Sequence, residues 1–102
     1  MMTKELFYDK IQGIVPSEEK EAADELYDML SVGYDGDGPA MAIDALADVA
    51  ANFPEEVVKA VYAHLAKGTL NTFELMAAAN LVQEGVSQEE IARRAYIGEL
   101  MV

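Results

Sequence analysis

Carboxylate side chains are the most numerous groups in this sequence that could bind a partner or do chemistry. Residues 18–48 contain ten of them and one lysine, so this third of the chain carries −9 of a total charge of −12. Glu18, Glu21 and Glu25 recur at intervals of three or four residues, the spacing that places side chains on one face of a helix. Such a row attracts basic partners and repels nucleic acid and anionic membranes. The candidate partner-binding residues are Glu18, Glu21, Asp24, Glu25, Asp28, Asp35, Asp37, Asp44 and Asp48.

Metal binding is a second chemistry that carboxylates support. An Asp-Gly-Asp-Gly loop offers oxygen ligands, but its register differs from that of a calcium-binding EF-hand loop. With Gly38 at the glycine position of such a loop, Gly33 stands where the first carboxylate is needed. A weaker divalent site built from Asp35, Asp37 and Asp44 is the alternative to an ordinary turn. We therefore predict no required metal and no cofactor.

Catalysis finds little support in the residue types. The chain has no cysteine and one histidine, so thiolate nucleophiles and the usual zinc ligand sets are excluded. His64 falls at the edge of an apolar helical stripe, where we expect a boundary residue or a surface contact, and the sequence gives it no recognisable partner for proton transfer. The serines fit helix caps and helix ends rather than a nucleophile turn. The sequence predicts a non-enzymatic protein without catalytic residues.

The elements that position these groups are predicted to be helices throughout. Caps, apolar stripes of helical period and breakers follow one another about six times, and no β-alternation of useful length occurs. A chain of 102 residues fits one domain with a modest core. We therefore predict an all-α, compact single-domain bundle of five to six short helices over residues 1–102. The expected helices begin near residues 3, 17, 39, 54, 72 and 87.

The central helix is expected at approximately residues 72–84. The nine residues after Glu74 include no charged side chain, a pattern typical of a helix surrounded by protein. Asn71 with Glu74, and Ser87 with Glu90, have the spacing of two capping boxes. These boxes predict where the central helix and the last helix begin.

The acidic residues are expected on the outer faces of the second and third helices. The second helix, with Ser17 as its predicted cap, carries apolar residues on one half of its circumference and carboxylates on the other. The third helix is expected to show Asp44 and Asp48 to solvent. The residues that it is expected to bury are Ile43, Leu46, Val49 and Ala50.

Two functions of different classes fit these patterns. The first is a non-catalytic binding protein that engages a basic protein partner through the acidic face of the second and third helices, with imitation of a nucleic-acid strand as one form of that binding. The second is a self-associating structural or accessory module, in which acidity serves only solubility and apolar residues off the main stripes form a subunit interface. Those apolar residues are Leu6, Met41, Ile97, Leu100 and Met101.

Charge and hydropathy limit the partners and the location. A net charge of −12 disfavours direct binding to nucleic acid, and Arg93 with Arg94 alone do not form a phosphate-binding patch. No stretch approaches the ~20 apolar residues of a membrane span. The absence of cysteine fits a cytoplasmic location. We therefore expect a cytoplasmic protein with neither a membrane nor a nucleic-acid partner.

Overall fold

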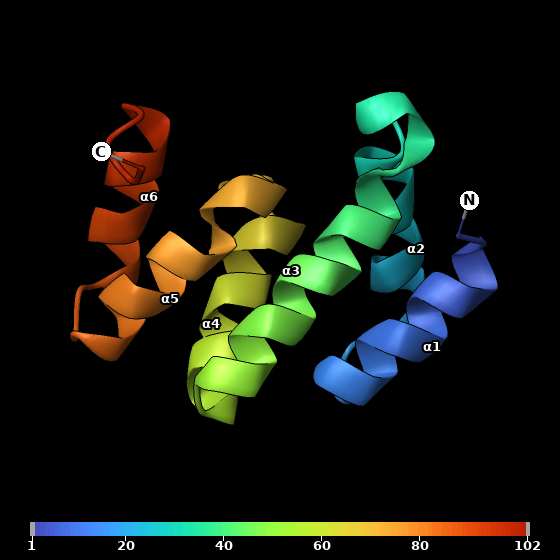
Figure 1. Ribbon diagram of the computed structural model, residues 1–102, viewed down its shortest axis with the longest axis horizontal. Helices are drawn as coiled ribbons and strands as arrows, with labels where there is room; N and C mark the ends of the chain where they lie inside the picture. Colours follow the sequence, from blue (N-terminus) through green and yellow to red (C-terminus); the bar gives the residue numbers. More distant parts are fainter. Residues whose placement is uncertain (1, 102) are drawn as a thin grey trace.

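Helices form every regular element of the described chain. The computed structural model describes residues 2–101, except for the side chain of Tyr34. Six α-helices and two short 3-10 helices (η) follow one another, and residues 2–101 contain no strand (Figure 1). This confirms the predicted all-α fold of five to six short helices. The elements are α1 Lys4–Ile14, α2 Lys20–Leu30, η1 Tyr34–Gly36, α3 Gly38–Asn52, α4 Glu55–Ala66, η2 Thr72–Glu74, α5 Leu75–Gln83 and α6 Gln88–Tyr96.

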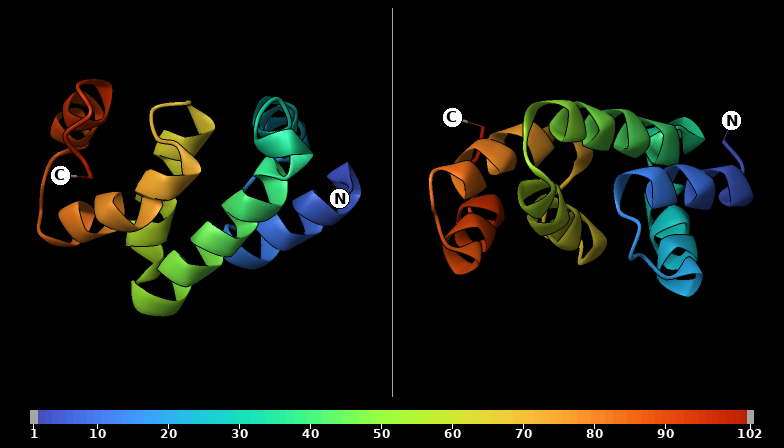
Figure 2. Two further views of the ribbon diagram at one scale, coloured as in Figure 1. Left: turned by 45° about the horizontal axis from the view of Figure 1, so that its top comes forward. Right: turned by 90° about the horizontal axis from the view of Figure 1, so that it is seen from below.

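The six α-helices alternate between two layers along the long axis of the molecule. α1, α3 and α5 lie in one layer, and α2, α4 and α6 lie in the other (Figure 2, right). α1 and α6 therefore lie at opposite ends of the molecule, which measures 34 × 26 × 20 Å (Figure 1). The longest helix of the described part, α3, has 15 residues, and no helix there combines the length and the hydropathy needed to cross a membrane.

The centre of the packing is α3. It packs against α1, α2, α4 and α5, whereas the main helical neighbours of α5 are α3, α4 and α6. The segment expected at the centre, residues 72–84, therefore lies in the middle of the C-terminal half. α5 buries Leu75, Ala78 and Ala79 on one side, but Met76 on its other side is 38% exposed. An uncharged helix need not be buried all round, because alanine, amide and thioether side chains are tolerated in water.

The core consists of apolar residues at helical spacing. The predicted stripe of α3 is buried at Ile43, Leu46 and Val49, while Ala42 is buried in place of the exposed Ala50. Buried apolar residues from all six helices form one continuous cluster. A cluster of this kind removes apolar surface from water, which is the main favourable term in folding.

Helix starts follow the predicted capping residues with one exception. The Asn71 side chain accepts hydrogen bonds from the Phe73 and Glu74 N–H groups, as predicted, and Thr3, near which the first helix is expected to begin, accepts one from the Leu6 N–H. Ser17 does not cap α2, because residues 15–18 form a turn before that helix and Glu19 occupies the position preceding its first residue. The correction matters for the acidic surface, since it removes Glu18 from α2.

Candidate partner-binding surface

The carboxylates of α2 lie in two rows with different surroundings. In the row nearer α1, Lys20 Nζ lies 2.9 Å from Asp24 Oδ2 and Lys4 Nζ lies 3.0 Å from Asp28 Oδ1. The hydrogen bond to its carboxylate raises the pKa of each lysine. The negative charges of Asp24 and Asp28 are therefore matched by cations of the same molecule.

The outer row consists of Glu21 and Glu25, which are exposed and lie one helical turn apart. Neither forms an ion pair with a lysine or arginine of residues 2–101. Towards and beyond the end of the helix, Met29 is 44% and Val32 is 89% exposed. We call these four residues the outer α2 face. It presents an acidic stretch that leads into an apolar one.

Glu18 lies in the wall of a groove rather than on α2. Its carboxylate accepts a hydrogen bond from the Tyr62 hydroxyl, and its carbonyl oxygen accepts one from Gln12 Nε2 at 2.5 Å. Burial, and then the bond to Glu18, raise the pKa of Tyr62 above its ordinary value. The groove holds about 370 Å³ between the loop before α2 and α4, and Lys59 and Lys67 also line it. Both signs of charge therefore line the groove, and Lys59 Nζ also lies 3.3 Å from Glu55 Oε1.

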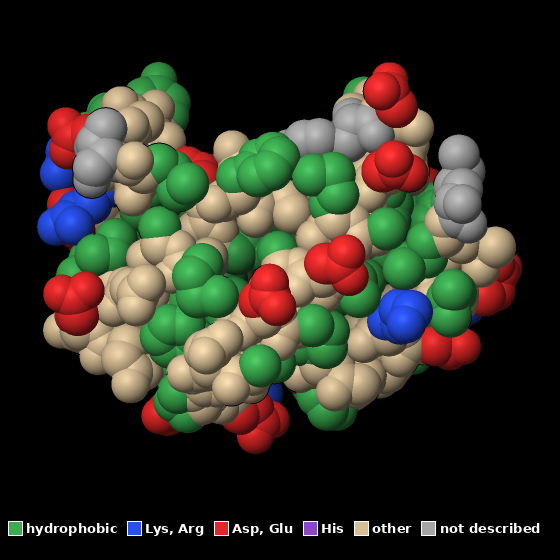
Figure 3. Space-filling model, viewed as in Figure 1, with side chains coloured by type: hydrophobic (Ala, Val, Ile, Leu, Met, Phe, Trp, Pro, Cys, Tyr) green, Lys and Arg blue, Asp and Glu red, His purple; other side chains and the backbone are tan. Residues whose placement is uncertain are grey.

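The other predicted acidic residues are spread over two further regions. Asp35 belongs to η1 and has a left-handed backbone with φ of 53°, and Asp37 precedes α3 without a side-chain capping bond. Asp44 and Asp48 are exposed on α3, which lies in the opposite layer from α2 (Figure 2, right). In the view of Figure 3, acidic side chains over α3 stand apart among apolar and uncharged groups. The structure therefore does not bring Asp44 and Asp48 together with the outer α2 face.

The loop proposed as a weak cation site does not gather its ligands. Among residues 2–101, no group of three or more His, Asp or Glu side chains is arranged to hold a metal ion. Asp35, Asp37 and Asp44 thus do not form such a group in the described structure.

His64 is buried, with 6% of its surface exposed, so the expected boundary or surface position is wrong. The chain folds back after α4, and the backbone N–H groups of Thr69 and Leu70 donate to the His64 carbonyl at 2.9 and 3.4 Å. His64 Nε2 has no hydrogen-bond partner in the described structure. No carboxylate bonds to the ring, so the histidine lacks the orienting partner that acid–base catalysis uses.

Exposed apolar side chains gather along one edge of the molecule. The end of α2, η2 and the C-terminal end of α6 all lie at the top of Figure 1, and apolar groups are visible along that edge in Figure 3. Of the predicted interface residues, Leu6, Ile97 and Met101 are exposed, Met41 is half-buried and Leu100 is buried at 8% exposure. We call the exposed residues of these three segments the apolar edge: Met29, Val32, Phe73, Tyr96, Ile97 and Met101.

A groove opens on this edge where the end of α2 meets the end of α4. It holds about 200 Å³, and its lining includes Met29, Leu30, Leu65, Leu70 and Thr72. Periodicity alone could not reveal it, because its walls come from helices far apart in the sequence. We call it the α2–α4 groove.

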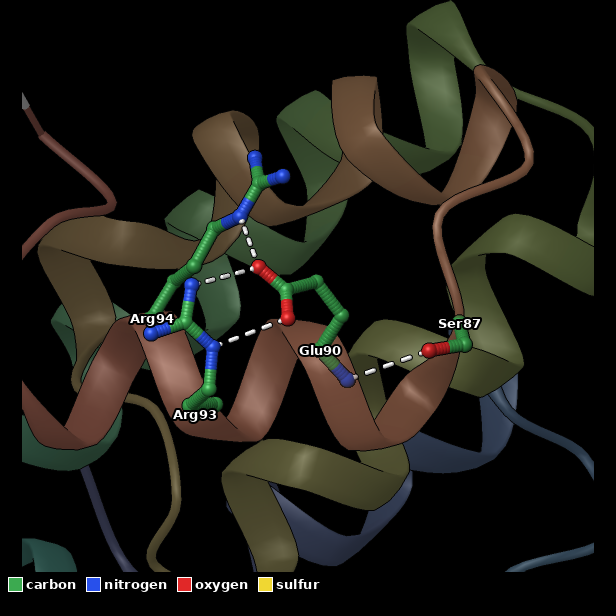
Figure 4. Close-up of polar contacts among 4 residues, drawn as sticks. All are labelled: Ser87, Glu90, Arg93 and Arg94. Carbon is green, nitrogen blue, oxygen red and sulfur yellow. Dashed lines mark hydrogen bonds and ion pairs between the residues drawn. The ribbon is translucent and has the colours of Figure 1, made fainter.

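α6 carries a charge cluster in which one carboxylate binds two arginines. Glu90 accepts hydrogen bonds from Arg93 Nε and Nη2 at 2.9 and 2.8 Å, and from Arg94 Nε at 2.7 Å (Figure 4). The hydrogen bonds from the two arginines lower the pKa of Glu90 to about 2. Ser87 caps the helix by accepting from the Glu90 N–H at 3.1 Å. The Glu90 carboxylate binds arginines instead of completing the predicted capping box.

Comparisons of the chain with protein-family models, with characterised proteins and with solved structures found no match.

Proposed function

We propose that this is a non-catalytic binding protein that engages a basic protein partner through its outer α2 face. Glu21 and Glu25 supply the negative charge of that face, and Met29 and Val32 supply its apolar part. Residues 18–48, which include this helix, carry −9 of the net charge of −12, and a negative field favours encounter with a positively charged surface.

One observation supports the proposal most strongly: Glu21 and Glu25 are exposed and have no cation partner in residues 2–101. Neighbouring lysines were available, but Lys4 and Lys20 bind Asp28 and Asp24 on the other row. Like charges one helical turn apart repel each other. A basic partner would relieve that repulsion at the outer row. It would gain little binding energy at the row nearer α1, where lysines of this chain already bind the carboxylates.

The same contacts favour a basic protein segment over imitation of a nucleic-acid strand. Imitation requires a long, evenly spaced row of unmatched charges. Here Glu18 is bonded to Tyr62, and the charges of Asp24 and Asp28 are matched by lysines. The outer row is therefore short, which suits contact with a few lysine or arginine side chains.

Capture of partners on immobilised protein tests this function. We expect the wild-type protein to retain the same basic proteins from a native lysate as Asp44→Lys with Asp48→Lys, because those residues lie on the opposite layer. Glu21→Lys with Glu25→Lys, which changes the net charge equally, should retain them poorly, and high salt should release them from the wild type. Equal retention by both double variants, or no retention by the wild type, would contradict the proposal.

Self-association is the second candidate, and one observation favours it. Tyr96, the last residue of α6, is 91% exposed, and Met101, five residues further along the chain, is 62% exposed. α6 lies at the opposite end of the molecule from α2 (Figure 1). Exposed apolar patches are commonly interfaces between subunits. Light scattering at high concentration should then detect a dimer or larger assembly that Tyr96→Asp converts to monomer. A monomer for the wild type removes this candidate.

A further inference from the structure

The α2–α4 groove has the size for side chains of a partner rather than for a whole small molecule. Its volume is about 200 Å³, whereas small-molecule pockets usually measure about 300–1,000 Å³. Its walls are mainly aliphatic, with Met29, Leu30, Leu65 and Leu70. Thr72 also lines it, and the hydroxyl of this residue is buried with no hydrogen-bond partner in the described structure.

Charge around the groove favours a basic occupant. Gly33 in its wall leads into η1, and a backbone hydrogen bond of 3.1 Å to the Gly33 carbonyl closes that turn. The turn holds Asp35 near the groove, and Asp35 and Asp37 are both exposed. On α2, Glu25 stands one helical turn before Met29 of the groove wall. None of the lining residues is charged, and Lys67 precedes the lining residue Gly68, so three carboxylates and one lysine stand close to the lining in sequence.

The form of the occupant follows from the known ways in which proteins bind peptides. Addition of a strand needs an exposed sheet edge, and the described chain has no strand. Proline-rich segments use grooves lined by aromatic rings, and the rings of this molecule are not in the lining of this groove. An amphipathic helix that inserts apolar side chains into a groove is the mode that remains. Methionine in the wall suits that mode, since its flexible side chain adapts to the shape of the partner.

We propose that the α2–α4 groove receives apolar side chains of a basic amphipathic helix in the partner. The lysine or arginine side chains of that helix face Glu21, Glu25, Asp35 and Asp37, while its apolar stripe contacts Met29 and enters the groove. This inference rests on the proposed function and adds to it the kind of segment that is recognised.

Two synthetic peptides of identical composition test the groove. Each has about 18 residues of lysine and leucine; in one the leucines share one helical face, and in the other the order is scrambled so that they do not. We expect fluorescence anisotropy at about 0.1 M salt to show the amphipathic peptide binding at least about tenfold more tightly, because burying one aliphatic side chain is worth about a factor of ten.

Two matched variants test whether the difference in peptide binding arises in the groove. Met29→Lys and Leu6→Lys each replace an apolar side chain that is 44% exposed and add the same charge. Met29→Lys should weaken binding of the amphipathic peptide about tenfold or more, and Leu6→Lys should change it by less than about twofold.

A second pair adds bulk without charge. Gly33→Phe alters the groove wall and Gly13→Phe does not, and an added Cβ meets nothing within 4 Å at either glycine. We expect Gly33→Phe alone to weaken binding of the amphipathic peptide.

The outcomes separate this inference from the function on which it rests. Equal binding of the two peptides, or unchanged binding in both Met29→Lys and Gly33→Phe, overturns the groove and leaves charge-based binding at α2 standing. Failure of the wild type to bind either lysine–leucine peptide overturns the proposed function itself.

Discussion

The amphipathic helices α2 and α6 have similar sequence patterns and opposite electrostatic arrangements. In α6, two arginines of the same helix bind Glu90 and lower its pKa to about 2. In α2, Lys20 and the distant Lys4 bind one row of carboxylates and leave Glu21 and Glu25 open to solvent. α2 therefore keeps an unpaired acidic row, whereas the Glu90 carboxylate of α6 is paired within its own helix.

The two helices also differ in how they are held. α6 buries only Ile91 among its residues, whereas α2 buries Ala23, Leu26 and Leu30. The start of α3 approaches the end of α2 so closely that Gly38 lies against the Leu30 carbonyl. The acidic helix thus has the broader support.

The largest effect is expected from removing the single buried anchor of α6. Ile91→Ala should lower the free energy of unfolding by about 2–5 kcal/mol, because the cavity forms at a fully buried position. Ile97→Ala is the control, since that side chain is 45% exposed and should cost within about 0.5 kcal/mol. Urea unfolding measures both. Equal losses would contradict the single-anchor description of α6.

The next effect concerns the support of α2. An added Cβ at Gly38 would lie 1.9 Å from the Leu30 carbonyl oxygen, a backbone atom that cannot move aside cheaply. Gly38→Ala should therefore destabilise the protein by about 1–3 kcal/mol. Gly33→Ala meets no atom within 4 Å and should be neutral or stabilising. If thermal unfolding ranks the two variants the other way, the close contact between α2 and α3 is wrong.

A smaller effect on stability is expected at Tyr62, whose hydroxyl binds the Glu18 carboxylate. Tyr62→Phe should cost about 1 kcal/mol at neutral pH through the lost hydrogen bond. The raised pKa keeps the Tyr62 hydroxyl protonated in the folded protein at a pH where the same hydroxyl ionises in the unfolded chain. The contribution of Tyr62 to the free energy of unfolding is therefore complete below pH 10 and falls as the pH rises further.

The alkaline loss of stability should be shallower in Tyr62→Phe than in the wild type. Tyr96→Phe, at a residue that is 91% exposed, is the control and should match the wild type at every pH. Denaturant unfolding at neutral pH and at about pH 11 compares them. An unchanged alkaline slope in Tyr62→Phe would contradict the raised pKa of Tyr62, to which burial contributes first and the bond to Glu18 second.

The smallest effect is expected from the charge cluster of α6. The pKa of Glu90 falls from 4.5 to about 2 on folding. The contribution of the Glu90 carboxylate to the free energy of unfolding is therefore complete above pH 4.5 and is lost as the pH falls through about 2. Glu90→Gln should therefore be less stable than the wild type at neutral pH and should approach it near pH 2. Glu89→Gln, on the same helix, should show no such convergence. The difference should shrink in high salt, because the groups are exposed.

Features set by local sequence could be predicted, and features set by tertiary contacts could not. Helical period and capping residues such as Thr3 and Asn71 act within a few residues of the chain, so the all-α class followed from them. The spacing of Glu18 predicts that it belongs to the acidic row. Its carboxylate instead binds Tyr62, which is 44 residues away in the sequence, and local spacing carries no information on such a contact. Spacing also cannot tell that α2 and α3 belong to different layers.

The missed features of the candidate surface share that cause. The α2–α4 groove combines residues of α2, α4 and η2, and His64 lies beside Thr69 and beside Gln88 and Ala92 of α6. Buried Leu100 belongs to a short apolar segment after α6 whose packing no periodicity describes. A sequence pattern identifies the face of one helix, and only the fold identifies which faces meet.

The most direct test of the central claim removes two charges from each of the compared regions. Glu21→Gln with Glu25→Gln and Glu84→Gln with Glu89→Gln lower the net negative charge equally, one pair on α2 and the other around α6. Isothermal titration with the amphipathic lysine–leucine peptide should show about three- to tenfold weaker binding for the α2 pair. The α6 pair should bind within about twofold of the wild type. Equal weakening by the two pairs would contradict the account, because total charge rather than the outer α2 face would then determine binding.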